Sequence, residues 1–478
     1  MTRGGGEGAV DAPRDWSGAL FSFVGFVGTV VVLSSAALLA TPYPFLALVP
    51  PLLLLSVLLF AFYPQFGFYL IIATIPFWAF RGLPGPLEFL KVHWLLALVL
   101  VMLLPLKHVP RKTFSSGLRS NLWPFFLLFV GVSLLSAIRS PYPESAFANV
   151  FRLGLAGVLV ALTLVLVGRE GFRRTLPTVL VWSVSASALL AVVGYFFDVP
   201  IFVSESEEDV FTRGSGGALG PVNLSFLIVS IVPFLGYRIL FPEKRGDRIV
   251  STALLIVNLL GLVTTFSRGG AILLALVALA LLVEFARRIR IRHVLAFAAS
   301  ISVVALVVVP WIPDTWWARQ KNVLEAQDKA MRRRFSYLVV AREAIEESPV
   351  LGHGPGTFRD IYAGTAWARE FEREGTTLRR FAHNTYLEVL VGTGAIGLAT
   401  FLLVLYIGLR NYALAKKEFL RKGEKALALL TGSYRLSFLA ILAFFFLKSA
   451  VDNKTFLVAL ALSSVAARVA REAAPRSG

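Results

Sequence analysis

The chain has 478 residues, of which 56% are hydrophobic and 16% are charged, and its formal net charge is +18. Soluble domains are usually about 45–50% apolar and about a quarter charged, so this composition, with a mean hydropathy of +0.73, excludes a largely soluble protein. The absence of cysteine excludes disulfide bonds and thiolate metal sites.

Apolar stretches of roughly 17 to 25 residues recur along the chain, and each is long enough to cross about 30 Å of hydrocarbon as a helix. They predict an all-α polytopic membrane protein with about 14 transmembrane helices, or 12 to 13 if a segment within 45–81 or 426–468 is re-entrant. The predicted spans cover residues 17–40, 45–63, 66–81, 87–105, 122–139, 147–168, 176–197, 219–241, 249–266, 269–286, 294–311, 384–409, 426–447 and 453–468.

Basic loops alternate with loops that carry few basic residues. The basic loops are 107–119, 169–174, 244–248, 287–292 and 410–425, and all fall on one side of the predicted topology. The positive-inside rule makes this side cytoplasmic, which places both termini in the cytoplasm and accounts for much of the positive charge without nucleic-acid binding. Three regions follow: transmembrane helices in 1–311, a periplasmic loop in 312–382, and transmembrane helices with a cytoplasmic tail in 383–478.

The 312–382 insert is the longest polar stretch in the chain. Within it, Phe335, Leu338, Val339 and Ile345 recur at helical spacing over residues 334–347. This spacing predicts an amphipathic helix that lies with these side chains against the membrane domain. The glycine-rich stretch 352–356 then predicts a turn.

An arginine opens one predicted span on the periplasmic side. Arg268 follows Ser267 and precedes Gly269 and Gly270, so its guanidinium would lie beside free backbone N–H groups at a helix N-terminus. Such a position suits a phosphate or diphosphate, although an arginine at a span end can also extend to the interface without a ligand. Arg213, which glycines and a predicted helix start also follow, is a second candidate for binding an anion.

Five histidines occur in the chain. His383, with Asn384 after it, begins a predicted span at the end of the insert, where the helix N-terminus favours a neutral ring. A neutral imidazole at this position is a candidate general base, and the alternative is a structural role. The others lie in loops or at span ends and are interpreted as solvated or structural: His93, His108, His293 and His353.

Three motifs in order resemble the O-antigen ligase and O-antigen polymerase superfamily. They are Ser-Arg-Gly-Gly at 267–270, the run from Arg334 to Phe358 with Gly-His-Gly-Pro-Gly, and Ala-His-Asn-Thr-Tyr-Leu-Glu at 382–388 followed by Gly-Ala-Ile-Gly. The chain departs from the family pattern at Leu338, where members commonly have an aromatic residue, and at 220–223, where Gly-Pro-Val-Asn stands near the usual Asn-Pro-Asn.

The resemblance implies a GT-C-like bacterial inner-membrane glycosyltransferase with a periplasmic active site and no cofactor or metal. It implies that a glycan moves from an undecaprenyl-diphosphate donor to a glycolipid or glycan acceptor, such as lipid A–core, by direct displacement. It also implies His383 as base, Arg268, Arg213 and Arg334 as diphosphate contacts, and supporting roles for Ser267, Gly269, Gly270 and Asn384.

Two alternatives remain open from the sequence. The first is an O-antigen or exopolysaccharide polymerase with the same chemistry, which the predicted number of spans slightly favours. The second is a transporter of polysaccharide or lipid-linked glycan. Transporters often contain two similar halves with interrupted helices at mid-membrane, and neither feature is visible in this sequence.

Overall fold

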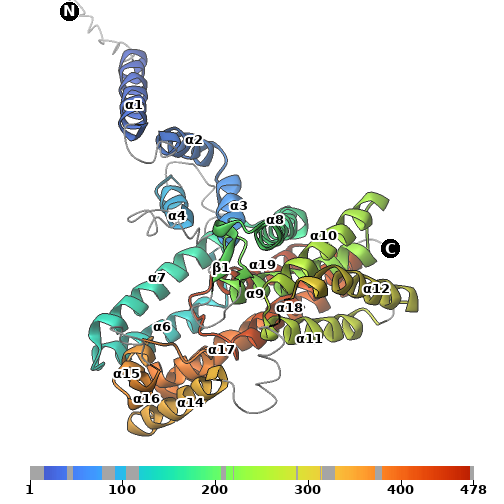
Figure 1. Ribbon diagram of the computed structural model, residues 1–478. Coiled ribbons are helices and arrows are strands. Elements are labelled where there is room, and N and C mark those ends of the chain that lie inside the picture. Colours follow the sequence, from blue (N-terminus) through green and yellow to red (C-terminus); the bar gives the residue numbers. More distant parts are fainter. Residues whose placement is uncertain are drawn as a thin grey trace, which may run out of the picture. The chain divides into compact units, whose positions relative to one another are not determined.

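The computed structural model describes residues 16–39, 47–77, 92–103, 118–205, 212–218, 220–286, 289–312, 314, 329–371 and 379–473. Figure 1 shows a predominantly helical chain whose strands form one short hairpin. The chain divides into two compact units, one of Met1–Gly67 with Val99–Lys107 and the other of Phe68–Leu98 with His108–Gly478.

The first unit contains α1 (Trp16–Leu39) and α2 (Val49–Phe62). Prolines occupy the first turn of α2, where a missing N–H costs nothing, and leucines cover its surface, including the exposed Leu52, Leu55 and Leu58. A helix that is apolar all round is expected to face lipid. The boundaries between the two units along the chain fall within α3 (Pro64–Thr74) and α4 (Val92–Leu103).

The second unit contains the other helices and the β-hairpin. The elements that precede the insert are η2 (Ile75–Phe77), α6 (Trp123–Ile138), α7 (Pro143–Leu166), η5 (Gly171–Thr175), α8 (Leu176–Phe197), η6 (Pro200–Phe202), β1 (Val203–Glu205), β2 (Thr212–Gly214), α9 (Pro221–Leu240), α10 (Arg245–Thr264), α11 (Arg268–Glu284), α12 (Ile291–Val308) and η7 (Val309–Trp311). The insert contains α14 (Lys329–Glu347), α15 (Phe358–Ala363) and α16 (Ala366–Glu370), and the chain ends with α17 (Thr385–Arg421), α18 (Lys425–Phe444) and α19 (Lys454–Glu472).

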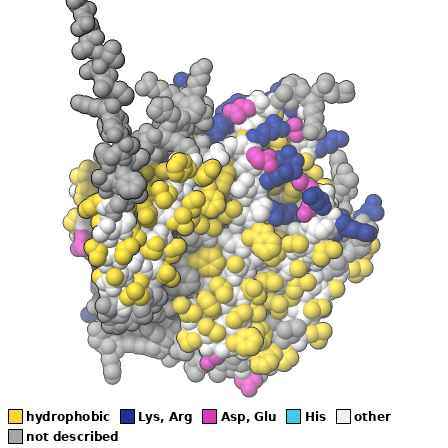
Figure 2. Space-filling model, turned by 90° about the horizontal axis from the view of Figure 1, so that it is seen from above, with side chains coloured by type: hydrophobic (Ala, Val, Ile, Leu, Met, Phe, Trp, Pro, Cys, Tyr) yellow, Lys and Arg dark blue, Asp and Glu magenta, His cyan; other side chains and the backbone are white. Residues whose placement is uncertain are grey.

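Every predicted span overlaps a helix of the structure. In the part of the chain that the structure describes, 6 helices are long and apolar enough to cross a membrane, and several others are shorter apolar helices. A multi-pass, all-α membrane protein is therefore confirmed, whereas about 14 crossings stays a prediction. Figure 2 shows the corresponding surface, on which a broad apolar area adjoins a separate area rich in charged side chains.

Small residues let the helices of the second unit approach closely. A Cβ atom at Gly261 of α10 would lie 2.8 Å from the Cβ of Ala188 on α8, and one at Gly408 of α17 would lie 3.0 Å from side chains of α18 and α19. Such contacts hold membrane helices together where lipid removes the hydrophobic driving force between them. The last helix, α19, is buried along most of its length.

The amphipathic helix predicted in the insert exists as α14, and its predicted buried face is correct only in part, because Ile345 packs against the buried cluster. Phe335 and Leu338 are 58% and 55% exposed. The buried side chains instead follow the i, i+3, i+4, i+7 pattern, and they are Tyr337, Val340, Ala341 and Ala344. α14 packs on α15 and the start of α17, and two alanines on its contact face leave room for these neighbours. The sequence prediction considered only the large apolar residues and therefore overlooked the alanines.

A glycine turn joins the insert to a break in α17. Gly394 has φ +65°, which interrupts the helical backbone of α17. There the N–H groups of His353 and Gly354 donate to the carbonyls of Val391 (3.0 Å) and Gly392 (2.8 Å), and Ala395 N–H donates to the Pro349 carbonyl (2.8 Å). Figure 1 shows α14, α15 and α16 gathered at this end of α17.

We expect Gly394→Ala to lower the temperature of unfolding. The added Cβ would lie 2.2 Å from the carbonyl carbon of Val350, and an alanine at φ +65° is strained, which costs about 1–3 kcal/mol even without the clash. Thermal unfolding in detergent measures the change. Gly364→Ala is the matched control, because its nearest atom lies 3.4 Å away and its φ is −77°. Equal unfolding temperatures for the two variants would contradict the assigned role of the break.

Candidate active site around His383

His383 lies directly before α17, at the junction between the insert and the bundle. Its backbone is left-handed, with φ +53°, and the next residue, Asn384, caps α17 by accepting the N–H of Leu387 at 3.1 Å. The imidazole packs beside Tyr337 of α14, with ring centroids 5.6 Å apart. The predicted position of His383 at a helix start is therefore correct, and Asn384 has a structural role as the cap.

The imidazole is held neutral by its surroundings. Burial above all lowers the pKa of His383 from its ordinary 6.5 to about 4. Positive charges lower it further, in decreasing order those of Lys448, Arg334, Arg380 and Arg333. Protonation therefore disfavours the folded state, and this histidine makes the fold less stable as the pH falls from about 6.5 toward 4.

Lys448 is a site residue that the sequence analysis missed. It lies between α18 and α19, and its Nζ donates to Asn223 Oδ1 in the first turn of α9 at 2.6 Å. Thr385 attaches this loop to α17, since its Oγ1 donates to the Lys448 carbonyl at 2.6 Å. Burial lowers the pKa of Lys448 to about 8. In the sequence, Lys448 resembles an ordinary lysine at the end of an apolar span, so no local signal marked it.

Arg268 is the first residue of α11, one residue before the start of the predicted span 269–286. Ser267 caps this helix by accepting the N–H of Gly270 at 3.1 Å and receives a hydrogen bond from Ser225 of α9 at 3.0 Å. A Cβ at Gly269 would lie 2.9 Å from the side chain of Leu447, the residue before Lys448. The start of α11 therefore lies against the loop that also carries Lys448.

Arg213 joins the same region through the backbone. It is paired with Ser204 in the β1–β2 hairpin, and its Nε donates to the carbonyl of Thr265 at 2.9 Å. Thr265 belongs to the turn that leads into Arg268, so Arg213 lies against that turn. The glycines after Arg213 pack closely on α8, where Ser187 Oγ donates to the Gly216 carbonyl at 2.8 Å. Their role in the structure is this close contact.

Arg334 is exposed on α14, and its charge acts on His383 as stated above. Of the other histidines, His353 is structural. It lies in the glycine turn, and its Nε2 is 2.8 Å from the carbonyl oxygen of Ala344 in α14. His108 and the side chains of His93 and His293 lie outside the described residues.

Glu388 is a second residue whose role the sequence analysis did not identify. Its side chain is 7% exposed, and Oε1 accepts the N–H of Ala382 at 2.7 Å and the hydroxyl of Ser449 at 2.9 Å. The carboxylate thereby ties the backbone before His383 to the residue after Lys448. An acidic residue five positions into an apolar span is itself a signal of function, and this signal could have identified Glu388.

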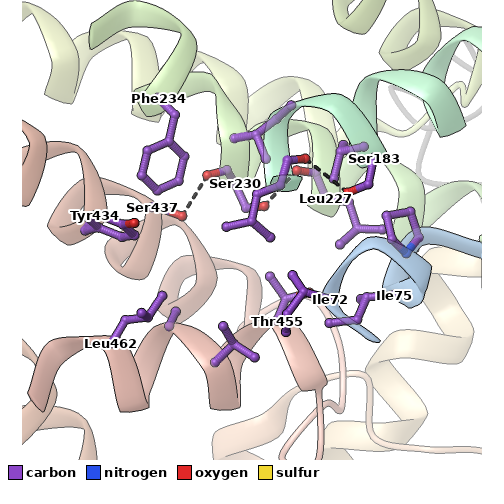
Figure 3. Close-up of a pocket in the computed structure, with 16 residues that line it drawn as sticks. Ile72, Ile75, Ser183, Leu227, Ser230, Phe234, Tyr434, Ser437, Thr455 and Leu462 are labelled. Carbon is purple, nitrogen blue, oxygen red and sulfur yellow. Dashed lines mark hydrogen bonds between the residues drawn. The ribbon is translucent and has the colours of Figure 1, made fainter. Parts of the chain in front are cut away.

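An apolar pocket lies deeper among the helices, as Figure 3 shows. Ile72, Leu227 and Phe234 are among its lining residues, and Ser437 of α18 donates across it to the Ser230 carbonyl at 2.7 Å. The lining contains no charged side chain. The charged groups that can act on a substrate gather instead at the starts of α9, α11 and α17.

One known family matches a part of the chain that contains several of these residues. Residues 253–402 match the family described as O-antigen ligase. This range includes Arg268, Arg334, His383 and Glu388, whereas Arg213 and Lys448 lie outside it. A search of the curated proteins finds no match.

We expect Lys448→Met to raise the pKa of His383, because it removes the positive charge that has the largest effect on that pKa. The titration of ¹³C-labelled histidine by NMR measures this pKa, with the His383 signal assigned by its loss in His383→Asn. Lys417→Met, at an exposed position toward the other end of α17, is the control. An unchanged pKa in Lys448→Met would show that Lys448 does not act on His383.

Proposed function

The chain belongs to the O-antigen ligase superfamily through residues 253–402, and we propose that it is a membrane glycosyltransferase. In this proposal it moves a glycan from undecaprenyl diphosphate to a glycolipid or glycan acceptor at the periplasmic face of the inner membrane. The observation that carries the proposal is a partly buried His383 at the start of α17, packed beside Tyr337, whose pKa is lowered first by burial and then by nearby cations.

A neutral imidazole can accept the proton of an acceptor hydroxyl. As the hydroxyl oxygen forms a bond to the anomeric carbon, the bond from that carbon to the diphosphate oxygen breaks, and the electron pair leaves with undecaprenyl diphosphate. The hydroxyl proton passes to His383 and is later released to water. Base catalysis of this kind contributes about 10²- to 10⁴-fold to a rate.

Cationic side chains suit the departing diphosphate. We assign this role to Arg268, Arg213 and Arg334, and we add Lys448, whose ammonium group is fixed by Asn223; of these, Lys448 and Arg334 act on His383. Donors already aimed at the developing negative charge stabilise a transition state without reorganisation. Ser267, Gly269 and Gly270 support the site by shaping the start of α11 around Arg268.

Donor binding also adjusts the base. A pKa of about 4 makes His383 a weak base in the free protein. A bound diphosphate would offset the positive charges of Lys448 and Arg334, and its own negative charge would raise the pKa of His383 toward the working pH. The histidine thus becomes an effective base when the donor is present.

An assay in liposomes tests the proposed function. Purified protein receives an undecaprenyl-diphosphate oligosaccharide without ATP or added metal, with and without lipid A–core. Longer glycans from the donor alone indicate a polymerase, and a product that requires lipid A–core indicates a ligase. If undecaprenyl diphosphate is released in neither arm, the proposed function is wrong.

We expect His383→Asn to reduce turnover by about 10²- to 10⁴-fold while donor binding remains close to normal, since the base acts on the acceptor proton. Asparagine tolerates the left-handed backbone at φ +53° better than alanine, so this change isolates the imidazole. Turnover and donor affinity are measured in the liposome assay, with His383→Ala in parallel. Near-normal turnover in either variant would refute the role of His383.

We expect Arg268→Ala to weaken donor binding and to slow turnover, each by about tenfold or more, because a charge-assisted contact to phosphate acts in both the ground state and the transition state. Donor affinity is measured by titration of the donor into the variant. Arg173→Ala, at an exposed position where the arginine pairs with Glu243, is the control. Donor affinity and rate equal to those of the control would remove Arg268 from the site.

A further inference from the structure

A second pocket, mostly apolar with a few polar groups, is lined by residues near His383 in the chain. The space in it, counted together with the solvent at its mouth, is about 690 Å³, and it is bounded by α6, α7, the glycine turn, Phe381, α17 and the loop between α18 and α19. Two of its lining residues, Phe381 and Glu388, flank the Ala382–His383 backbone, and Glu388 accepts the Ala382 N–H. One residue, Ala382, therefore separates the pocket wall at Phe381 from His383.

None of the proposed diphosphate contacts lines the pocket. Successive residues of the loop between α18 and α19 reach in different directions, since Lys448 donates to Asn223 of α9 and Ser449 donates to Glu388 of α17. The first contact belongs to the diphosphate side, and Ser449 lines the pocket. A direct displacement requires the nucleophile to approach the anomeric carbon opposite the leaving group, so the acceptor must enter from the side away from these cations.

The lining has the chemistry that a saccharide requires. Hydroxyl groups both donate and accept, and here they would meet the carboxylates of Glu388 and Asp452, the amide of Asn149 and the guanidinium of Arg152. Phe381, which is 41% exposed, adds an apolar ring face. The Cζ atom of Arg359 lies over this ring, 5.9 Å from its centroid. A few polar groups in a partly apolar pocket are typical of a small-molecule site.

Two of the polar groups are also held in place. Asn149 donates to the Ser145 carbonyl at 2.8 Å, and its Oδ1 is 3.4 Å from Nη1 of Arg152 one turn along α7. A Cβ at Gly356 would lie 2.2 Å from Nδ2 of Asn149, so only glycine lets the turn approach this amide. The docked glycine turn therefore forms one wall of the pocket.

We infer that this pocket binds the terminal sugar of the acceptor, with Arg152 and Asp452 as the residues that determine which saccharide is accepted. The inference rests on the proposed function and adds to it the place of the second substrate. A donor glycan attached to undecaprenyl diphosphate and a lipid A–core glycan present the same hydroxyl chemistry, so both serve as acceptor probes.

The test compares acceptor and donor kinetics in Arg152→Gln and Asp452→Asn. Each variant should raise the KM for the acceptor by about tenfold to a hundredfold, the loss expected for one hydrogen bond to a charged group, and should leave the KM for the donor unchanged. One arm uses lipid A–core as acceptor, and there the two KM values are measured separately. The other arm uses the donor glycan alone, which is donor and acceptor at once, so there the expected result is a rise in its single apparent KM.

Arg342→Gln and Glu346→Gln are the matched controls, because this exposed ion pair on α14 lies outside the pocket. Binding of lipid A–core to His383→Asn, measured by isothermal titration, gives a readout without turnover and should weaken when Arg152→Gln is added. If that binding is unchanged and the acceptor KM equals that of the controls, the pocket is not the acceptor site. In the lipid A–core arm, a raised donor KM would instead assign the pocket to the donor glycan and would also overturn the inference.

Failure of the inference and failure of the proposed function are distinguishable. If wild-type protein transfers glycan and the pocket variants behave like the controls, the inference alone is wrong. If wild-type protein releases no undecaprenyl diphosphate in either arm, the proposed function is wrong and the inference fails with it.

Discussion

The contact between the glycine turn and the broken start of α17 is the interaction on which the rest of the site depends. A continuous α17 would use the N–H of Ala395 within its own ladder, whereas the left-handed Gly394 releases this group to the Pro349 carbonyl. The exposed carbonyls of Val391 and Gly392 accept N–H groups of the turn in exchange. The backbone groups lost to the helix are thereby satisfied, which a membrane protein requires away from water. This contact holds α14 over His383.

The second constraint is electrostatic. Several cationic side chains act on one partly buried imidazole, an arrangement that is unfavourable until negative charge arrives. In the proposed function the donor diphosphate supplies this charge, so the free site is prepared for an anion and the base becomes stronger once the anion is bound. The free energy of donor binding would then include the relief of repulsion among Lys448, Arg334 and the other cations, in addition to direct contacts with phosphate.

Glu388 links the two proposed substrates. One of its oxygens binds the Ala382 N–H and the Ser449 hydroxyl, and the side chain also lines the pocket assigned to the acceptor. A shift of this carboxylate would move both the backbone before His383 and the loop that carries Lys448. Acceptor binding and the orientation of the base are therefore expected to be coupled through one buried group.

The sequence by itself determined the class of the protein and the elements that carry the site. Hydrophobic length placed a helix at each predicted span, and the motifs around Arg268, Arg334 and His383 indicated the family that residues 253–402 match. These features are local, because they follow from runs of apolar residues, glycines and caps. The tertiary structure decided which face of α14 is buried, since that depends on the small side chains that α15 and α17 can accommodate. It also brought Lys448 and Asn223 together from positions 225 residues apart. No local pattern marks such a pair, because the contact exists only after α9, α17 and α18 have packed.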